Sequence, residues 1–334
     1  MASEPAVYQV SSEEIRLALQ PSSAAEVVLL AAQCLRVGSL DVALAVCEAW
    51  QGPPEPAVAL MRAAALFGQG EHAPAIELVD EVLAACPDNL AALFYRAQMA
   101  QHVADFERAE AWLLRVLGRF PDFPGAQAAL ASLRLPGPPY RDVLRRLHEL
   151  LKPRTYLEVG VETGATLGLA HASLRAVGID PSSKALRPEL VPANARVFHE
   201  TSDDFFARRT RAQALGEHHI ELAFIDGMHW FEYALRDFMN VEAWSQPSGV
   251  IVLHDCLPVF PLTASRERRT KFWVGDVWKV VQILSEFRPD LSVKVIATAP
   301  SGLCVVRRLD PGSSVLAQRF DEICLLYTSP SPRD

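Results

Sequence analysis

Two short motifs place acids and histidines at the ends of apolar segments. One is FIDGMH, which carries Asp226 and His229, and the other is IVLHD, which carries His254 and Asp255. Carboxylates and imidazoles are the side chains that move protons near neutral pH and that bind divalent cations. Enzyme clefts collect such ionisable groups, whereas a lone histidine is often only a hydrogen-bonded core residue. The motifs therefore indicate a catalytic or cation-binding site, with the core alternative open for each histidine.

The segments around these motifs predict adjacent parallel strands. Residues 221–225 form an apolar strand before Asp226, and a helix is expected through Ala243. Residues 247–249 are expected to turn the chain into a second strand, 250–253. Because the carboxyl ends of parallel strands meet at one edge of an open α/β sheet, where ligands bind, the two motifs should lie side by side.

A glycine-bearing turn follows an earlier predicted strand, residues 155–159, and a helix is expected to begin near Ala165. Glycines allow a ligand to approach the backbone, and a helix N-terminus offers free N–H groups. The G-x-G-x-x-G fingerprint of nicotinamide and flavin sites fails, because positions 162 and 165 are not glycine. The missing fingerprint therefore argues against a nicotinamide oxidoreductase. The candidate ligand contacts of this turn are Glu158, Gly160, Glu162 and Gly164.

The next two predicted strands also end near polar residues. Residues 176–179 lead to Asp180, about twenty residues after the glycine turn, which suits hydrogen bonds to ribose hydroxyls. Residues 196–198 form a third strand, and Ser202 and Asp203 lie between it and a helix. Asp and Ser also cap helices, so a capping role is the alternative for all three polar residues.

The C-terminal part predicts a helix over 276–287 and two strands over 291–297 and 302–309. A tight turn at 300–302 joins these strands, so they should pair antiparallel. Strands and helices that alternate along the chain predict an α/β domain with a mostly parallel sheet.

The segment EVGVETG resembles motif I of class I S-adenosylmethionine-dependent methyltransferases. With FIDGMH, GVIVLHD and the FWVGDVWKVV segment, residues 141–320 resemble a small-molecule branch of that family, some members of which carry tetratricopeptide repeats in front. The resemblance implies a Rossmann-like, mostly parallel seven-stranded sheet with an antiparallel closing hairpin. Three positions depart from the pattern: Met228 replaces a common acid, Phe231 a tyrosine and Ser248 a glycine.

The resemblance further implies S-adenosylmethionine as cofactor and O-methylation of a small-molecule or sugar hydroxyl. In this fold the loop with Ser202 and Asp203 flanks the adenine. The implied cofactor-binding residues are Glu158, Gly160, Glu162, Gly164, Asp180, Ser202, Asp203 and Asp226.

Two mechanisms stay open for the acceptor proton. In the first, His229 or His254 is the general base, with Asp226 in the catalytic group. In the second, Asp226 and Asp255 bind Mg²⁺, which lowers the pKa of the acceptor hydroxyl. Related metal-dependent enzymes add an Asn or Asp where this chain has Cys256, a poor ligand for a hard cation. Asp226 can also shape the cofactor pocket without any metal.

A different class of function is also open. The chain can be a catalytically inactive scaffold that binds a partner and keeps a cofactor pocket. Met228, Phe231 and Cys256 motivate this alternative, whereas the retained acids and glycines speak against it.

Residues 22–135 are rich in Ala and Leu at helical spacing and contain three stretches that align with one another. They start at Gly38, Gly70 and Ala104, which are 32 and 34 residues apart, and Ala43, Ala75 and Ala109 take the same place in them. A period near 34 resembles tetratricopeptide repeats. We expect three helix pairs that stack into a solenoid, as a platform for a protein partner, for self-association or for a carrier-bound acceptor. A domain that only caps and solubilises its neighbour is the alternative.

Composition and charge limit which other classes of partner we expect. The chain has 334 residues and a net charge of −8, without a long basic run, which argues against nucleic acid. No apolar run reaches the ~18 residues of a membrane span, and residues 1–16 do not read as a secretory signal. Six cysteines without a CxxC pair predict reduced thiols and a cytoplasmic protein.

Prolines and a glycine in LPGPPY, residues 135–140, predict the boundary between the two domains. The last residues, 324–334, resemble translated adaptor sequence at the end of some open reading frames. We therefore expect a non-native tail there that fits nothing in the fold, with an ordinary Ser/Pro tail as the alternative.

Overall fold

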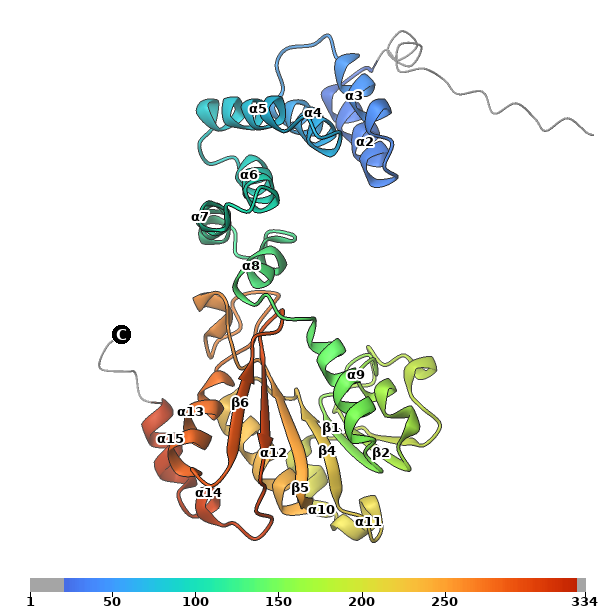
Figure 1. Ribbon diagram of the computed structural model, residues 1–334, viewed down its shortest axis with the longest axis vertical. Coiled ribbons are helices and arrows are strands. Elements are labelled where there is room, and N and C mark those ends of the chain that lie inside the picture. Colours follow the sequence, from blue (N-terminus) through green and yellow to red (C-terminus); the bar gives the residue numbers. More distant parts are fainter. Residues whose placement is uncertain (1–20, 329–334) are drawn as a thin grey trace, which may run out of the picture. The chain divides into compact units, whose positions relative to one another are not determined.

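The computed structural model describes residues 21–328, shown in Figure 1. Contacts divide the chain into two compact units between Ala129 and Leu130. Residues 1–16, where the sequence lacks a secretory pattern, and residues 329–334 of the expected tail lie outside the described part. Within the described part, no helix combines the length and the apolar character needed to cross a membrane.

The first unit is helical, as the repeats predict. Local caps explain several helix starts, since the side chains of Ser23, Asn89 and Asp105 each accept a hydrogen bond from a backbone N–H in the first turn. The helices are α2 (Ala24–Arg36), α3 (Leu40–Glu48), α4 (Pro56–Gly68), α5 (His72–Ala85), α6 (Leu90–His102) and α7 (Phe106–Arg119), with α8 (Ala126–Arg134) at the unit boundary.

Three helix pairs, α2–α3, α4–α5 and α6–α7, confirm the predicted repeat. The turn between the helices of each pair contains a left-handed residue, with φ of 77° at Gly38, 89° at Gly70 and 60° at Ala104. The small residues Ala43, Ala75 and Ala109 are fully buried where the helices touch. The alanine period therefore marks the contact between paired helices, because a larger side chain would separate them.

The second unit contains a seven-stranded sheet in the order β3-β2-β1-β4-β5-β7-β6. The first five strands pair in parallel, and β7 pairs antiparallel with both β5 and β6, which confirms the expected closing hairpin. The strands are β1 (Thr155–Val159), β2 (Arg175–Ile179), β3 (Ala195–Phe198), β4 (Ile220–Ile225), β5 (Ser245–His254), β6 (Ser292–Ile296) and β7 (Leu303–Arg307).

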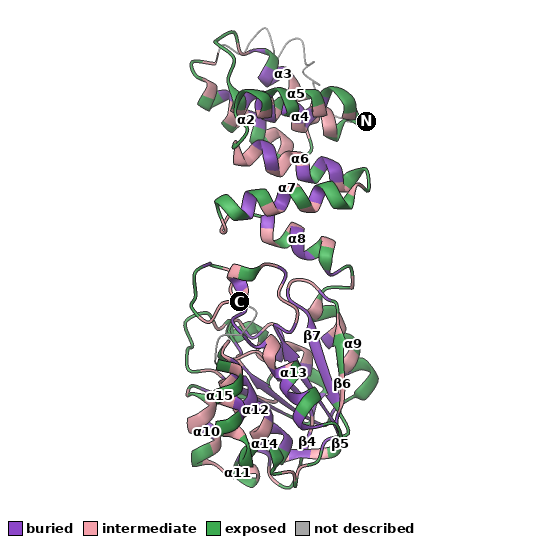
Figure 2. Cartoon of the chain, turned by 90° about the vertical axis from the view of Figure 1, so that its left-hand side faces the viewer, coloured by how far each residue is buried: buried purple, intermediate pink, exposed green. Residues whose placement is uncertain are grey.

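Helices cover both faces of this sheet, and the buried residues coloured in Figure 2 follow the strands. One face packs against α10 (Ser202–Arg208), α11 (Arg211–Leu215), α12 (Phe231–Trp244), α13 (Trp278–Phe287), α14 (Val315–Gln318) and α15 (Phe320–Thr328). The other packs against α9 (Tyr140–Leu151) and the 3₁₀ helix η1 (Leu167–Ala172). Short 3₁₀ helices η2 (Pro188–Leu190) and η3 (Pro261–Ala264) lie in the loops. Strands covered on both faces read as continuous apolar runs, which is why the sequence revealed them.

Local structure differs from the sequence-based expectation in three places. A 3₁₀ helix that begins at Leu167 follows the glycine turn, instead of an α-helix from Ala165. Residues 247–249 continue strand β5 instead of forming a turn, with an irregular register opposite Ile220. Helix α15 runs on to Thr328, so the first residues of the expected tail belong to the fold.

Candidate active site

The site lies at the carboxyl edge of the sheet, where the turns after β1 and β4 touch. The Asp226 N–H donates to the Val159 carbonyl oxygen at 2.8 Å. Gly160 has φ of 85°, and a Cβ there would lie 1.9 Å from the Asp226 carbonyl oxygen. Only glycine permits this approach, so the sequence of the turn fixes the distance between the glycine loop and Asp226.

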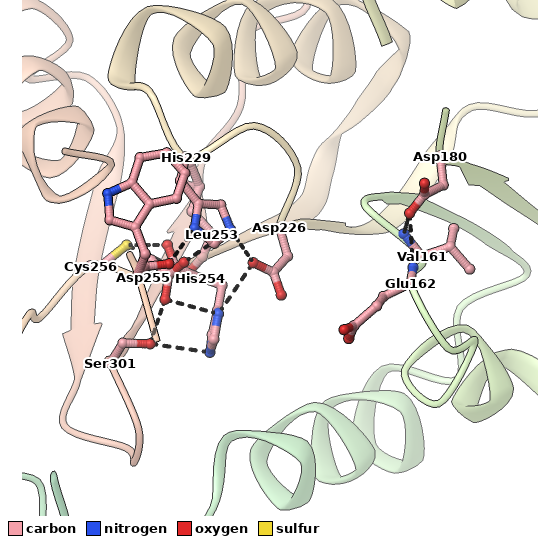
Figure 3. Close-up of polar contacts among 11 residues, drawn as sticks. Val161, Glu162, Asp180, Asp226, His229, Leu253, His254, Asp255, Cys256 and Ser301 are labelled. Atoms are coloured by element: carbon pink, nitrogen blue, oxygen red, sulfur yellow. Dashed lines mark hydrogen bonds and ion pairs between the residues drawn. The ribbon is translucent and has the colours of Figure 1, made fainter. Parts of the chain in front are cut away.

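Asp226, His229, His254 and Asp255 come together as predicted (Figure 3). The His229 Nε2 atom lies 3.6 Å from Asp226 Oδ1 and 3.3 Å from Asp255 Oδ2. The His254 Nδ1 atom lies 3.3 Å from an oxygen of each acid. Both imidazoles therefore face the same two carboxylates.

His229 is the more accessible of the two imidazoles, and Trp273 fixes the orientation of its ring. About a quarter of its side chain is exposed. Its Nδ1 lies 2.8 Å from the Trp273 carbonyl oxygen, and the Trp273 ring stacks on it with centroids 5.3 Å apart. Because a carbonyl only accepts hydrogen bonds, Nδ1 carries the proton, and Nε2 presents either a lone pair or a second proton to the acids.

His254 is buried, with 7% exposure. The Tyr140 ring packs on it with centroids 4.4 Å apart, and its Nε2 lies 3.5 Å from Ser301 Oγ. The side of the ring that a substrate could reach is thus covered. Of the two histidines predicted as general bases, His229 has the access that proton transfer from an acceptor requires.

Asp255 has a strained backbone. Its φ of 60° lies in the left-handed region, which is unfavourable for a residue with a side chain. Its carboxylate is buried and accepts a 2.6 Å hydrogen bond from the Ser301 hydroxyl. Strain of this kind persists where the surroundings fix a conformation that the site uses.

The four ionisable groups shift one another's pKa values. Burial alone would lower the pKa of His254, but the charges of Asp226 and Asp255 raise it to about 9. Burial would also lower the pKa of His229, but the effect of the same two acids is larger and raises it. Burial would raise the pKa of Asp226, but the neighbouring imidazoles hold it below its usual range, whereas burial dominates and raises the pKa of Asp255. Near neutral pH the cluster therefore holds protons between its acids.

Asp226, His229 and Asp255 also form a group that can hold a metal ion. One ligand atom from each lies within 4.8 Å of the others. Two carboxylate oxygens and an imidazole nitrogen suit a divalent cation. The Cys256 thiol donates toward the carbonyls of Leu253 and His254, at 3.5 and 3.3 Å, and takes no part in this group.

Asp180 lies on the other side of the site, against the glycine loop (Figure 3). Its Oδ2 accepts hydrogen bonds from the backbone N–H groups of Val161 and Glu162, at 2.9 and 2.8 Å. Its Oδ1 accepts one from Ser182 N–H, but no helix follows within residues 181–186, so the helix-cap alternative is wrong. Asp180 instead fixes the glycine loop, and Glu162 there adopts φ of 46°.

Glu158 lies beneath the glycine loop and is fully buried. It accepts hydrogen bonds from the hydroxyls of Tyr156 and Thr166 at 2.6 and 2.7 Å. Burial raises the pKa of Glu158 to about 8 despite these bonds. Near neutral pH burial therefore favours the neutral acid, and a cation bound nearby would shift Glu158 toward its charged form.

The loop after β3 brings Ser202 and Asp203 to the start of α10, where the cap itself is Thr201. Asp203 pairs with Arg236 of α12 through two hydrogen bonds of 2.9 and 2.7 Å. The cap alternative for Ser202 and Asp203 is therefore wrong as well, because the neighbouring Thr201 caps the helix.

Several residues that contact the cluster did not stand out in the sequence, because their types are common in loops. Trp273 and Asp276 belong to the FWVGDVWKVV segment, and the Asp276 N–H donates to the His229 carbonyl at 3.1 Å. The Phe231 N–H donates to Asp276 Oδ1 at 2.9 Å. Tyr140 and Ser301, from the predicted boundary and the predicted turn, gave no chemical signal of their own.

Comparisons with known proteins agree with the two-domain division. Residues 157–256 match the family described as a methyltransferase domain, and residues 56–99 match the family described as a tetratricopeptide repeat. A search of the curated proteins found no match.

Solved structures similar to the chain include three methyltransferases. The O-methyltransferase TomG from Streptomyces achromogenes, in complex with SAM, is 18% identical, with 51% of this chain and 80% of that chain covered and a TM-score of 0.41. The O-methyltransferase from Bacillus cereus, in complex with SAH, is 16% identical over 60% of this chain and 99% of that chain, with a TM-score of 0.41. The SAH-bound methyltransferase PaMTH1 from Podospora anserina is 16% identical over 70% and 96%, with a TM-score of 0.41.

The glycine turn, the seven-stranded sheet and the family match lead to one conclusion. The chain carries a methyltransferase domain that includes residues 157–256, and a tetratricopeptide repeat at residues 56–99 precedes it.

Proposed function

We propose that this protein transfers a methyl group from S-adenosylmethionine to a hydroxyl group of a small-molecule, sugar or carrier-bound acceptor. The observation that carries the proposal is the group formed by Asp226, His229 and Asp255 beside the glycine loop. Oxygen acceptors need their proton removed near neutral pH, and this group provides an accessible imidazole next to two acids.

The cofactor would lie along the loops that follow β1 to β4. Glu158 and Asp226 supply negative charge for its methionine ammonium and sulfonium groups, and the loop held by Asp180 supplies backbone contacts. Ser202 and Asp203 would flank the adenine. The raised pKa of the buried Glu158 supports this placement, because a bound cationic group would offset the burial and stabilise its charged form.

The acceptor hydroxyl would lie against His229 Nε2. The Trp273 carbonyl keeps the proton on Nδ1, so Nε2 of the neutral ring is the atom that takes the acceptor proton. Alternatively, a divalent cation bound by Asp226, His229 and Asp255 would supply Lewis-acid chemistry and lower the pKa of a hydroxyl bound to it; Nε2 would then hold the ion and could not take the proton. The donor set fits such an ion, since the residues offer oxygens and one imidazole nitrogen. Alignment of acceptor and methyl donor by this rigid cluster would contribute several kcal/mol of rate acceleration.

Two of the departures leave the Asp226–His229–Asp255 group intact. Phe231 is fully buried at the start of α12, and Cys256 donates toward backbone carbonyls. This supports an active enzyme over the scaffold alternative. The repeats would serve as a surface for a protein partner, for self-association or for a carrier of the acceptor, which the match of residues 56–99 supports.

The test is calorimetric titration of S-adenosylmethionine and S-adenosylhomocysteine into the full chain, with and without Mg²⁺ or Mn²⁺. We expect micromolar binding. A panel of phenols, sugars and their methyl ethers, assayed for release of S-adenosylhomocysteine, then tests the acceptor class, with hydroxyl compounds active and ethers inactive. Absence of cofactor binding in every condition would overturn the proposal.

A further inference from the structure

The segment that follows the repeats, residues 135–141, is attached to the turn between β6 and β7. The Gly137 N–H donates to the Ala297 carbonyl at 3.0 Å, and the Tyr140 N–H donates to the Ala299 carbonyl at 3.3 Å. A Cβ on Gly137 would lie 2.2 Å from the Ala297 carbonyl oxygen. The two backbones are thus in direct contact within the catalytic unit.

The same turn holds the catalytic cluster through Ser301, which is fully buried. The Ser301 hydroxyl donates to Asp255 Oδ1 at 2.6 Å and lies 3.5 Å from His254 Nε2. The backbone around it is fixed as well, because the Leu257 N–H donates to the Ser301 carbonyl at 2.6 Å. Ser301 therefore contacts two members of the cluster from a turn that is hydrogen-bonded to the loop after β5.

Tyr140, at the end of the segment, covers the same histidine. Its ring centroid lies 4.4 Å from that of His254, and its hydroxyl accepts a 3.1 Å hydrogen bond from Arg141 instead of a bond from the cluster. The ring, not the hydroxyl, is what His254 contacts. Tyr140 is half-buried, so its ring leaves little room for His254 to rotate.

These contacts converge on His254 and Asp255, and one of them falls on a residue with a left-handed backbone. Simple packing accounts for the burial of Tyr140 and Ser301, but it does not account for both residues contacting His254 while Ser301 also bonds Asp255. An aspartate held at φ of 60° also needs partners that keep it there.

We propose that Tyr140 and Ser301 are positioning residues, which hold His254 and Asp255 in the orientation that forms the Asp226–His229–Asp255 group. The segment directly after the repeats is thereby part of the active site. The role of the group rests on the proposed function, whereas the contacts themselves do not.

Nitrogen-15 NMR of the histidine side chains in the full chain tests this directly. Ser301→Ala and Tyr140→Leu should each shift the His254 ring resonances, which a His254→Gln chain assigns. Tyr140→Phe keeps the ring and should restore the wild-type spectrum. Ser245→Ala is the matched control, because Ser245 is buried and donates a 2.7 Å bond to Val241 away from the cluster.

Titration of Mn²⁺ into the same chains, followed by electron paramagnetic resonance, gives a second readout. Groups that orient metal ligands typically change metal affinity 10–100-fold, so Ser301→Ala should weaken Mn²⁺ binding about tenfold. Tyr140→Phe and Ser245→Ala should bind Mn²⁺ like the wild type. Thermal melting of every variant shows which chains are folded and can be compared.

The outcomes separate this inference from the function it serves. His254 resonances that stay unchanged in both folded variants, Ser301→Ala and Tyr140→Leu, would overturn it, whether or not Mn²⁺ binds. A shift in Ser301→Ala alone would overturn the role of the segment after the repeats. If the wild type binds no Mn²⁺, the metal part of the proposed function fails, and the NMR comparison decides the positioning role by itself.

Discussion

Acidic side chains in two parts of the site lie at the same edge of the sheet, and different partners compensate their negative charge. Asp180 accepts hydrogen bonds from three backbone N–H groups, whose partial charges cannot leave. Asp226 and Asp255 face two imidazoles, whose protons can leave or be replaced by a cation. The role of an acid after a parallel strand therefore depends on its partner, which decides whether the acid fixes a loop or carries exchangeable charge.

The largest expected effect breaks the fixed side of this comparison. Asp180→Ala removes the acceptor of two N–H groups in the glycine loop, Val161 and Glu162, and of the Ser182 N–H. We expect a loss of roughly 3 kcal/mol in the free energy of unfolding, by the usual cost of hydrogen bonds to a charged group. The affinity for S-adenosylhomocysteine should fall at least about 100-fold, equivalent to ~2.7 kcal/mol. Chemical denaturation and calorimetry measure the two effects.

Glu189→Ala is the control. Glu189 is an exposed acid of η2, and its removal leaves the hydrogen bonds that fix the glycine loop in place. It should change neither quantity. If Asp180→Ala lowers stability but leaves the cofactor affinity intact, Asp180 only shapes the loop, and its placement in the cofactor site is wrong.

The second prediction tests the exchangeable side. His229→Ala removes the imidazole that lies between the acids, so we expect Mn²⁺ affinity to fall about 100-fold, at the upper end of the range for ligand and supporting groups. His171→Ala, at an exposed histidine of the same unit, is the control and should have no effect. Equal Mn²⁺ affinity in the His229→Ala and wild-type chains would remove His229 from the metal group.

The pH dependence has a defined sign. The acids raise the pKa of His229, so a proton occupies Nε2 more often than in a free histidine. A cation needs the unprotonated nitrogen, and Mn²⁺ affinity should therefore rise as pH increases through that raised pKa. Titrations between pH 6 and pH 9 test this, and a flat profile would show that no imidazole proton is displaced.

A third prediction concerns Asp237 of α12, an acid with neither kind of partner. It is 1% exposed and lies beneath Gly227, and neither of its oxygens makes a well-formed hydrogen bond, although the Ser202 hydroxyl is close enough to lower its pKa. Burial raises its pKa from 3.8 to about 7, with the Asp203 charge adding to the shift and the nearby Ser202 hydroxyl and Arg236 opposing it.

A raised pKa means that the folded protein prefers the protonated acid. Its stabilising contribution is full below about pH 4 and is lost as pH rises through about 7. The full shift is equivalent to about 4 kcal/mol, and the unpaired amide of Asp237→Asn offsets part of that. We expect this variant to exceed the wild type by about 1–2 kcal/mol at pH 8 and to lose the advantage at pH 5.

Urea denaturation at both pH values measures the difference. Asp321→Asn, at an exposed acid of α15, should show no such pH dependence. A variant that is less stable than the wild type at pH 8 would mean that the Asp237 carboxylate has a partner in solution.

The predictable parts of the molecule are those with a short-range signal in the sequence. The strands ahead of Asp180 and Asp226 are continuous apolar runs and could be placed within a residue or two, and the repeats have a period near 34. The strand ahead of Asp255 was placed correctly only at its end, since β5 begins five residues before the predicted start. The clustering of Asp226 with His254 followed from the topology of parallel strands alone.

The parts that could not be predicted depend on contacts between distant segments. Nothing near Tyr140 or Ser301 in the sequence points to His254, because the contact requires the β6–β7 hairpin to fold back. The partner of Asp180 was likewise hidden, since backbone N–H groups have no residue type. Residues 247–249 read as a turn from their proline and glycine, but they lie within β5 as an irregular stretch between the pairs that Ser245 and Val250 make with β4.

The smallest predicted effect concerns the end of the chain, where we expected residues that fit nothing in the fold. Helix α15 instead carries Tyr327 into contact with the core beside Phe231, with ring centroids 6.2 Å apart. The Tyr327 hydroxyl donates to Glu286 at 2.8 Å, and Lys279 donates to the Tyr327 carbonyl at 2.8 Å. The foreign origin of this segment stays a prediction, but its first residues pack like native ones.

A chain that ends at Ile323 should therefore lose about 1–2 kcal/mol of unfolding free energy, from one partly buried ring and two hydrogen bonds. A chain that ends at Thr328 keeps these contacts and is the matched control, with the stability of the full chain. Cofactor affinity should be the same in all three, because none of these contacts involves the glycine loop or the acids of the site. Equal melting temperatures for the chains ending at Ile323 and Thr328 would contradict this prediction. They would show that the part of α15 after Ile323 adds nothing to stability, as a non-native segment would.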